Sequence, residues 1–283
     1  MIPARIIQTG PPRIPLLLQA AVANVRLLHP AFEHEFFSDE RIEDFIRDAF
    51  PDCLRHYNTF RFRIQKYDFF RYLAVYHFGG FYLDQDVFLA RSLEPLLFSD
   101  CVFAFEELAE CPYFPRELDM DWQLANYAFA AEAGHPFLAR IIDNCIRAKR
   151  DDEWVRPMLA GVPKFVEPDY YVLNTTGPGL VSRTFAESPE LAASITVLMP
   201  EDACDMERWH QFGEFGVHHM NGSWRRQRSA VERIRIRLWE RRNLARMLAE
   251  GRKRGRRRLA VPEGVNSHEQ PPGATSIPLL DEE

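Results

Sequence analysis

Features typical of membrane-spanning or secreted proteins are missing from this sequence of 283 residues. No apolar run approaches the roughly 18 residues that a transmembrane helix requires. The most apolar early segment, 14–28, is interrupted by Gln19, Asn24 and Arg26. The first residues, MIPARIIQTGPP, lack the basic-then-apolar layout of a secretory signal. We therefore expect a cytoplasmic protein, with peripheral contact at the inner face of the membrane as an option.

Cysteine is also scarce, and no internal repeat is evident. The cysteines are odd in number, widely scattered and never arranged as Cys-x-x-Cys: Cys53, Cys101, Cys111, Cys145 and Cys204. This spacing fits neither a disulfide framework nor a zinc site. It predicts reduced thiols with structural roles in a cytosolic compartment.

Charge is distributed unevenly, although the formal net charge is only −6. Residues 225–258 contain 15 Lys or Arg against three Glu, a local charge of +12. The segment 259–283 contributes −5, which leaves −13 for residues 1–224. The body is therefore acidic, and a polyanionic partner would have to bind at the C-terminal end.

The length and composition predict one large domain with an appendage. We assign residues 1–225 to a globular domain, 226–258 to a basic helical appendage and 259–283 to a disordered tail rich in Pro, Gly and Ser.

Hydrophobic periodicity predicts an α/β fold. Strand patterns occur at 2–8, 32–37, 81–83, 102–106, 126–131, 195–199 and 216–220. Helical spacing occurs at 14–28, 38–50, 62–77, 135–147 and 226–250. The alternation of strand and helix at the start indicates a parallel sheet there. We expect residues 155–172 to be irregular and 174–179 to form a loop.

The strongest signal lies in the stretch KYDFFRYLAVYHFGGFYLDQDVFL, residues 66–89. A helical run is broken at Gly79-Gly80 and followed by a short apolar strand that ends in Asp84 and Asp86. Acids directly after a buried strand are costly unless a cation receives them. Two carboxylates on one side of an extended backbone suit Mg²⁺ or Mn²⁺. The alternative is a solvated turn, and the glycine pair with its apolar strand favours the metal.

Asp68 and Arg71 are neighbours on the preceding helix, three residues apart. An exposed pair of this kind would contribute little. The aromatic and apolar residues around them predict a buried helix instead: Tyr67, Phe69, Phe70, Tyr72, Leu73 and Tyr76. A buried Asp–Arg pair beside acids at a strand end favours binding of polar ligand groups.

These residues resemble the motifs of the DXD-containing sugar transferases of glycosyltransferase family 32. That family includes yeast-type initiating α-1,6-mannosyltransferases and bacterial capsular-polysaccharide enzymes. Four stretches match in order, across roughly residues 1–225: IPARIIQT from Ile2, YDFFRYL…GGFYLDQDV from Tyr67, TGPG from Thr176 and HHMNGSW from His218.

The resemblance implies a GT-A fold, a Rossmann-like nucleotide-diphospho-sugar transferase domain. It also implies Mn²⁺ or Mg²⁺ as cofactor. The donor would be GDP-mannose or a UDP-hexose, and the acceptor a glycan, a polysaccharide or a lipid-linked sugar. The resemblance also implies transfer with retained anomeric configuration. Because no carboxylate stands out as a nucleophile, we expect this to occur by same-face attack.

The metal ligands implied by the resemblance are Asp86 as the principal ligand, Asp84 at the metal or the ribose, and a late histidine. Whether His218 or His219 faces the metal depends on the phase of its strand. We favour His219 because it lies nearest the glycine turn.

The catalytic set implied is Asp68, Arg71, Asp84 and Trp224, with Trp224 donating its indole N–H to a leaving oxygen. Further positions would bind the donor: Gln8, Thr9, Gly10, Tyr72, Gly80, Tyr82, Asn126, Gly177 and Ser223. Ile7 and Gly10 stand where the family often has a histidine and an aromatic residue, so the preferred base stays open.

Two rival functions remain. A DxD phosphohydrolase usually has Thr or Val four residues after the first Asp, where this chain has Phe88. A sugar-nucleotide or glycan-binding protein without catalysis is disfavoured because Asp68, Arg71, Asp84 and Asp86 are all present.

The basic segment 226–258 also leaves alternatives. We expect no nucleic acid partner, because few aromatic residues follow Trp239 and the acidic body repels a polyanion. Contact with an anionic membrane contributes about 1 kcal/mol per well-placed basic residue. A solvated helix and tail is the remaining alternative.

Overall fold

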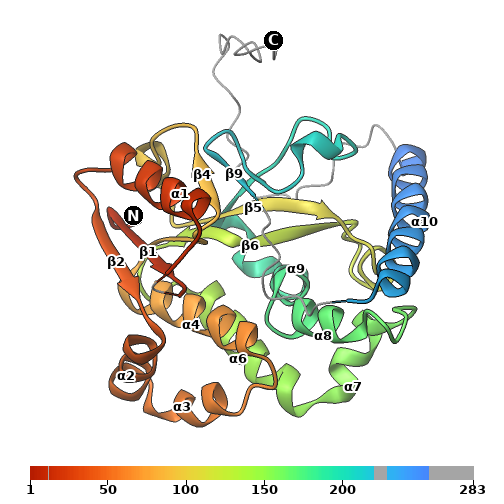
Figure 1. Ribbon diagram of the computed structural model, residues 1–283, viewed down its shortest axis with the longest axis horizontal. Helices are drawn as coiled ribbons and strands as arrows, with labels where there is room; N and C mark the ends of the chain where they lie inside the picture. Colours follow the sequence, from red (N-terminus) through yellow and green to blue (C-terminus); the bar gives the residue numbers. More distant parts are fainter. Residues whose placement is uncertain (12, 220–227, 255–283) are drawn as a thin grey trace.

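The computed structural model describes residues 1–11, 13–219 and 228–254, with side chains as far as Ala249. Its centre is a six-stranded mixed sheet of order β2-β1-β3-β6-β5-β7 (Figure 1). These strands are β1 Arg5–Thr9, β2 Glu33–Phe37, β3 Gly80–Leu83, β5 Cys101–Leu108, β6 Trp122–Ala131 and β7 Ile195–Leu198. β1 runs parallel to both β2 and β3, whereas β6 is antiparallel to its neighbours β3 and β5.

A second sheet of three short strands has the order β4-β9-β8. Its strands are β4 Val87–Leu89, β8 Gln211–Phe212 and β9 Gly216–His218. β4 follows β3 after only three residues, so the two acids of the D-x-D triplet lie where the chain passes from the large sheet to the small one.

Helices cover both faces of the large sheet (Figure 1). The α-helices are α1 Leu16–Leu28, α2 Asp39–Ala49, α3 Pro51–Asn58, α4 Arg63–Phe78, α5 Tyr113–Glu117, α6 Pro136–Arg150, α7 Asp152–Val155, α8 Glu167–Thr175, α9 Pro178–Ala186 and α10 Ala230–Arg254. Four 3₁₀ segments are described: η1 Glu94–Phe98, η2 Arg156–Leu159, η3 Pro189–Ser194 and η4 Met206–Arg208.

The core has two layers, one on each face of the sheet. Ile7 faces the larger cluster, which includes Phe69 and Phe70 of α4. Ile6 faces the smaller cluster, with Val25 of α1 and Phe81 of β3. Neighbouring residues of β1 are thus buried on opposite sides, as in a strand covered on both faces. The predicted α/β class and the parallel start of the sheet are confirmed, and the arrangement is consistent with the expected GT-A fold.

Several predicted elements differ from those observed. Residues 155–172, expected to be irregular, contain η2 and the start of α8, and most of the loop expected at 174–179 belongs to α8 and α9. The helix predicted at 38–50 ends at Ala49, and Pro51 begins a separate helix that was not predicted, α3, because proline is well suited to the first turn of a helix. The strand expected at 2–8 begins only at Arg5, and β4 and β8 were not predicted.

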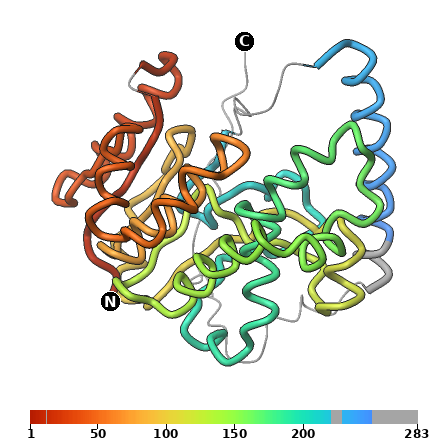
Figure 2. The backbone as a smooth tube through the Cα atoms, turned by 90° about the horizontal axis from the view of Figure 1, so that it is seen from below, coloured from red at the N-terminus to blue at the C-terminus, as the bar shows by residue number. Residues whose placement is uncertain are grey.

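α10 lies along the edge of the molecule opposite α1, as two perpendicular views show (Figure 1 and Figure 2). It confirms the helix predicted for the basic segment, although it begins at Ala230. The domain boundary at residue 225 and the predicted tail 259–283 lie outside the described residues. Within the described ranges, no helix combines the length and apolarity needed to cross a lipid bilayer.

Candidate active site at the end of the third strand

The route from α4 into β3 brings Arg71 back beside Asp84. From Arg71 to Gly79 the helix rises about 12 Å, and from Gly80 to Asp84 the strand runs back by about 13 Å. Because the two lengths are nearly equal, Asp84 ends level with Arg71. Gly79 and Gly80 make this reversal, with φ of 66° and 98°. A Cβ on Gly80 would lie 2.6 Å from the carbonyl oxygen of Arg5. The predicted glycine break therefore allows β3 to pair closely with β1.

Arg71 is buried between the two carboxylates. Its Nη2 lies 3.1 Å from Asp68 Oδ1 and 3.3 Å from Asp84 Oδ1. Its Nη1 donates to the carbonyl oxygen of Asn126 at 2.6 Å, and its guanidinium lies 4.6 Å from the centre of the Tyr82 ring. The guanidinium thus links α4, β3 and β6 at one point.

Asp68 accepts hydrogen bonds from two segments that are distant in the sequence. The Thr176 hydroxyl donates to its Oδ2 at 2.8 Å, and Asn126 Nδ2 donates to its Oδ1 at 3.2 Å. The Tyr72 hydroxyl receives a bond from the same Asn126 amide and donates to the carbonyl oxygen of Thr176. Both oxygens of Asp68 therefore already have donors within the protein.

Burial and the neighbouring charges shift the pKa values of these side chains in opposite directions. Burial raises the pKa of Asp68 and of Asp84 above the ordinary range, and the Arg71 cation opposes both shifts. Burial also disfavours the charged form of Arg71, but Asp84, Tyr82 and Asp68 outweigh it, so its pKa lies above its ordinary value. Arg71 is consequently the fixed positive charge of the site.

Asp84, Asp86 and His218 form a cluster suited to a divalent cation. One possible ligand atom from each lies within 4.8 Å of those from the other two. His218 Nε2 is 3.2 Å from Asp86 Oδ1, and its ring stacks on Tyr127 with 4.1 Å between ring centres. The two carboxylates suit Mn²⁺ or Mg²⁺, and the imidazole favours Mn²⁺ of the two, because Mg²⁺ prefers oxygen ligands. These three residues are the ones that would hold the ion.

The histidine in this cluster is His218, whereas the sequence favoured His219. β9 pairs with β4 so that His218 lies opposite Val87, next to Asp86. His219 is exposed, and its backbone N–H donates to the Asp86 carbonyl oxygen at 2.9 Å. Adjacent residues of an extended chain point to opposite sides, so only one imidazole can face the carboxylates. The phase of β9 therefore selects His218.

The end of β1 lies against the D-x-D turn. A Cβ on Gly10 would lie 2.2 Å from Gln85 Oε1, so these two segments approach closely. Gln8 is buried, and its Nε2 has no hydrogen-bond partner among the described residues. The Thr9 hydroxyl, by contrast, donates to the Phe37 carbonyl oxygen at 2.8 Å. Gln8 is thus the side chain at this strand end with a free donor.

Other predicted donor-binding residues have structural partners. Tyr72 is fully buried with its hydroxyl bonded on both sides, and the Tyr82 hydroxyl donates to Asp84 Oδ1 at 2.7 Å. Gly177 is buried between α8 and α9, where a Cβ would lie 2.9 Å from Leu173 Cα. These three residues hold the site together. Ser223 and Trp224 lie outside the described residues.

Three residues near the site were not singled out from the sequence. Thr176 bonds Asp68, and its position in the TGPG motif was the available signal. Gln65 Nε2 donates to Thr175 Oγ1 at 2.8 Å, one residue before Thr176. Tyr127 stacks on His218, and nothing in its sequence context marks it.

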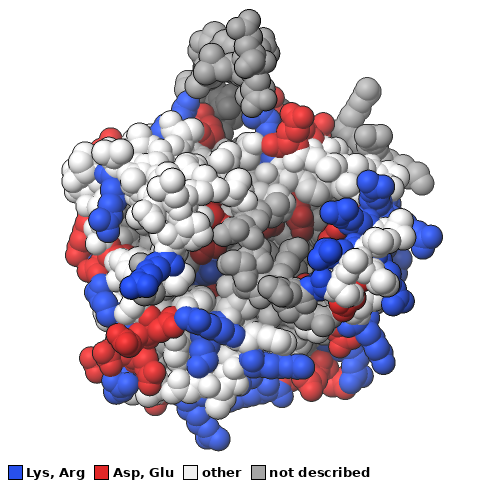
Figure 3. Space-filling view, viewed as in Figure 1, with Lys and Arg blue, Asp and Glu red and all other residues white. Residues whose placement is uncertain are grey.

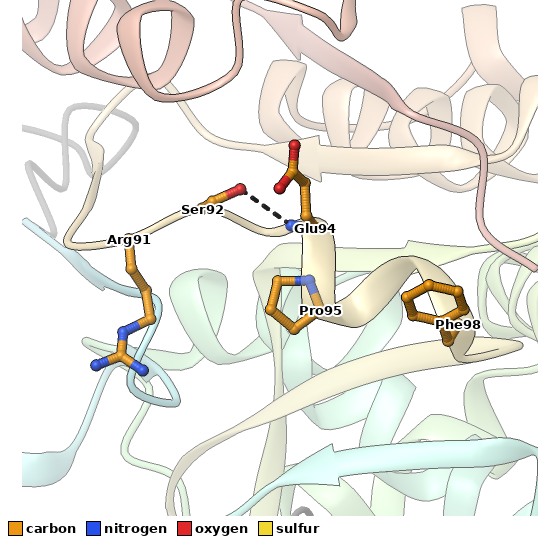
Figure 4. A pocket seen from close by; sticks show the side chains of 5 residues that line it. All are labelled: Arg91, Ser92, Glu94, Pro95 and Phe98. Atoms are coloured by element: carbon orange, nitrogen blue, oxygen red, sulfur yellow. Dashed lines mark hydrogen bonds between the residues drawn. The ribbon is translucent and has the colours of Figure 1, made fainter. Parts of the chain in front are cut away.

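A surface hollow lined by residues of the η1 segment lies elsewhere (Figure 4). Its lining residues are Arg91, Ser92, Glu94, Pro95 and Phe98, none of which belongs to the carboxylate cluster. Ser92 accepts a hydrogen bond from the Glu94 backbone N–H, a local turn contact. This hollow takes no part in the candidate site.

Comparison with known proteins gives a family match over the same region. Residues 15–103 match the model of the glycosyltransferase sugar-binding region containing the DXD motif. Inositol phosphoceramide mannosyltransferase 2 of Schizosaccharomyces pombe is 25% identical over 233 residues, covering 79% of this chain and 56% of that protein. The initiation-specific α-1,6-mannosyltransferase of the same organism is 25% identical over 171 residues, covering 55% and 40%.

The resemblance to glycosyltransferase family 32 is confirmed by these matches. The chain spans between 30% and 56% of the length of the first three curated relatives that it matches. Among solved structures, the galactosyltransferase LgtC in complex with donor and acceptor sugar analogues is 13% identical, with a TM-score of 0.41 over 87% of this chain and 95% of that one.

Proposed function

We propose that this chain is a metal-dependent, retaining glycosyltransferase that moves a hexose from a nucleotide-diphosphate sugar to a glycan or lipid-linked acceptor. The observation that carries the proposal is the convergence of Asp84, Asp86 and His218 beside the buried Arg71. A site of this composition combines ligands for a divalent cation with a fixed positive charge. The cation and the fixed positive charge would each stabilise the negative charge of a departing diphosphate.

Asp84, Asp86 and His218 would hold Mn²⁺ or Mg²⁺ in this site. When bound there, the cation supplies positive charge to the donor diphosphate. Arg71 keeps Asp84 in place through its two nitrogens, at 3.4 Å and 3.3 Å from the two carboxylate oxygens. The unpaired Gln8 amide at the adjoining strand end is the group we assign to the nucleotide.

Retention of configuration is carried over from the family resemblance, and the state of Asp68 bears on the route by which it is achieved. A covalent mechanism needs a carboxylate oxygen free to attack the sugar. Both oxygens of Asp68 instead accept hydrogen bonds, from Thr176 and from Asn126, and Asp68 also pairs with Arg71. We therefore assign Asp68 to positioning Arg71 and Asn126, and keep same-face attack as the mechanism.

Mannose is the sugar that the relatives favour. The names of several curated relatives describe mannosyl transfer, and those of the first three describe inositol phosphoceramide as the acceptor. We extend this to the present chain as GDP-mannose for the donor and a glycolipid with an anionic head group for the acceptor. A UDP-hexose donor is the competing outcome.

Incubation with a panel of sugar nucleotides and Mn²⁺ tests the proposal. A transferase should slowly release one nucleoside diphosphate and free sugar from its preferred donor, and Asp86→Ala should abolish the release. Asp48→Ala, at an exposed acid of α2, is the matched control and should leave the rate unchanged. Release of inorganic phosphate would indicate a phosphohydrolase, and no release from any donor would indicate a binding protein. Either result would reject the transferase.

A further inference from the structure

α10 is fixed to the body by one of its faces. Met247 is buried against the core, and the Trp239 ring meets Tyr170 of α8 edge-on with 5.2 Å between ring centres. Arg246 donates to the carbonyl oxygen of Glu110 at 2.8 Å. Ahead of the helix, Arg228 forms an ion pair with Asp169. These contacts determine which face of the helix is turned outward.

The outward face carries an apolar stripe. Val231, Ile234 and Leu238 are 66%, 59% and 57% exposed. Their spacing of three and four residues places them on one line along the helix, which the exposed Ala245 and Ala249 continue. This exposed line is therefore not the face of α10 that packs on the body. Large apolar side chains gathered on one exposed line indicate a contact surface.

Arginines flank this stripe on both sides. At 100° per residue, Arg237 and Arg241 lie on one side of it, and Arg235 and Arg242 on the other. All four side chains are exposed, but the Arg235 guanidinium lies over the Phe165 ring, 5.2 Å from its centre. This leaves Arg237, Arg241 and Arg242 as the arginines that can meet a partner. The whole helix has nine basic and three acidic residues. Figure 3 shows Lys and Arg side chains gathered over α10, with uncharged side chains between them.

We propose that the outer face of α10 docks on an anionic lipid bilayer, with the helix lying in the plane of the interface. The stripe of Val231, Ile234 and Leu238 would enter the boundary between head groups and acyl chains. The flanking arginines would reach the lipid phosphates, each contributing about fivefold in affinity. At 1.5 Å per residue the helix offers a contact about 37 Å long.

The arrangement of the two features favours lipid over the other anionic partner. A nucleic acid would pair with the arginines but leave the apolar stripe in water. A bilayer interface accommodates the stripe and the arginines together, because its acyl chains are apolar and its head groups are anionic. The acidic body, at −13 for residues 1–224, would be repelled by the same surface, so α10 would be the part of the chain that touches it.

This docking does not depend on the transferase proposal, but it would bring the site to a lipid-linked acceptor if that proposal holds. The full chain should sediment with vesicles of phosphatidylcholine and phosphatidylserine, and far less with phosphatidylcholine alone. Replacing Val231, Ile234 and Leu238 together by Ser should weaken this binding at least about tenfold. Replacing Arg237, Arg241 and Arg242 by Gln should have a similar effect.

Leu16→Ser with Leu27→Ser is the matched control, because both leucines are 80% exposed on α1, at the opposite edge. It should bind vesicles like the unaltered chain. Donor hydrolysis in solution should be unchanged in the Ser variant of α10, which separates a failure of docking from a failure of the transferase. Equal binding to neutral vesicles, or full binding by the Ser variant, would overturn the proposal. So would binding of DNA or RNA, or self-association without lipid, that needs the same residues.

Discussion

Arg71 lies between two carboxylates that approach it from different elements, Asp68 one turn earlier in α4 and Asp84 at the end of β3. Its Nη2 is 3.1 Å and 3.3 Å from their Oδ1 atoms. One buried cation thus compensates a buried anion, Asp68, and a partly buried one, Asp84. A divalent cation beside Asp84 and Asp86 would complete the neutralisation.

Replacing Arg71 by Met should be strongly destabilising, because it leaves the buried Asp68 and the partly buried Asp84 without their cation. The expected loss in the free energy of unfolding is about 3–5 kcal/mol, measured by urea denaturation at neutral pH. Arg47→Met removes an exposed ion pair with Asp44 and should cause no measurable change. Equal stability of the two variants would mean that Asp68 and Asp84 do not depend on Arg71.

The two adjacent histidines should differ in their effect on metal affinity. His218→Ala should weaken Mn²⁺ binding about tenfold or more, because it removes the imidazole beside Asp84 and Asp86. His219→Ala is the matched control, and it should leave the affinity unchanged because its side chain is exposed. Calorimetric titration of the apo protein with Mn²⁺ measures both. A larger loss of Mn²⁺ affinity in His219→Ala than in His218→Ala would instead indicate His219 as the ligand.

Tyr127 should matter for its ring and not for its hydroxyl. The ring stacks on His218, with an angle of 20° between the planes. Its hydroxyl is buried and has no hydrogen-bond partner in the described part of the chain. Tyr127→Phe should therefore keep Mn²⁺ affinity and not lower stability, since it removes a buried polar group without a partner. Tyr127→Leu, which keeps an apolar side chain but loses the stack, should weaken Mn²⁺ binding. Equal affinity in the two variants would reject the positioning role.

The central motif could be predicted from sequence because its signals are local. Gly79 and Gly80 mark a reversal, the apolar β3 predicts a buried strand, and the D-x-D acids follow at its end. Helical spacing alone put Asp68 and Arg71 on one face of α4. Each inference needs only neighbouring residues and the period of one element.

What could not be predicted depends on pairing between distant segments. The choice of His218 rests on the register of β9 against β4, and both strands have only three residues, too few for a clear period. The stacking of Tyr127 on His218 joins residues 91 positions apart. The α8–α9 junction has the composition of a loop, yet Gly177 and Gly179 are there because the two helices pack too closely for a Cβ.

His29 should make the fold less stable as the solution becomes acidic. Its buried ring uses both nitrogens in the neutral form: Nδ1 donates to the Val25 carbonyl oxygen at 2.9 Å, and Nε2 accepts from the Leu93 N–H at 2.8 Å. Burial lowers the pKa of His29 below its ordinary value of about 6.5. The unfolded chain therefore binds a proton more readily than the folded one. The contribution of His29 is fully present above about pH 6.5, the unfolded pKa, and is lost as the pH falls from there through the lower pKa of the folded state.

Urea unfolding at a series of pH values from neutral to mildly acidic measures this loss. In His29→Asn, the free energy of unfolding should be lower at neutral pH but should fall less steeply with acidification. His77→Asn, at an exposed position of α4, should keep the steep dependence of the unaltered protein. If the His29 variant and the unaltered protein lose stability in parallel, protonation of His29 does not oppose folding, and the link between α1 and the segment after β4 does not depend on its neutral ring.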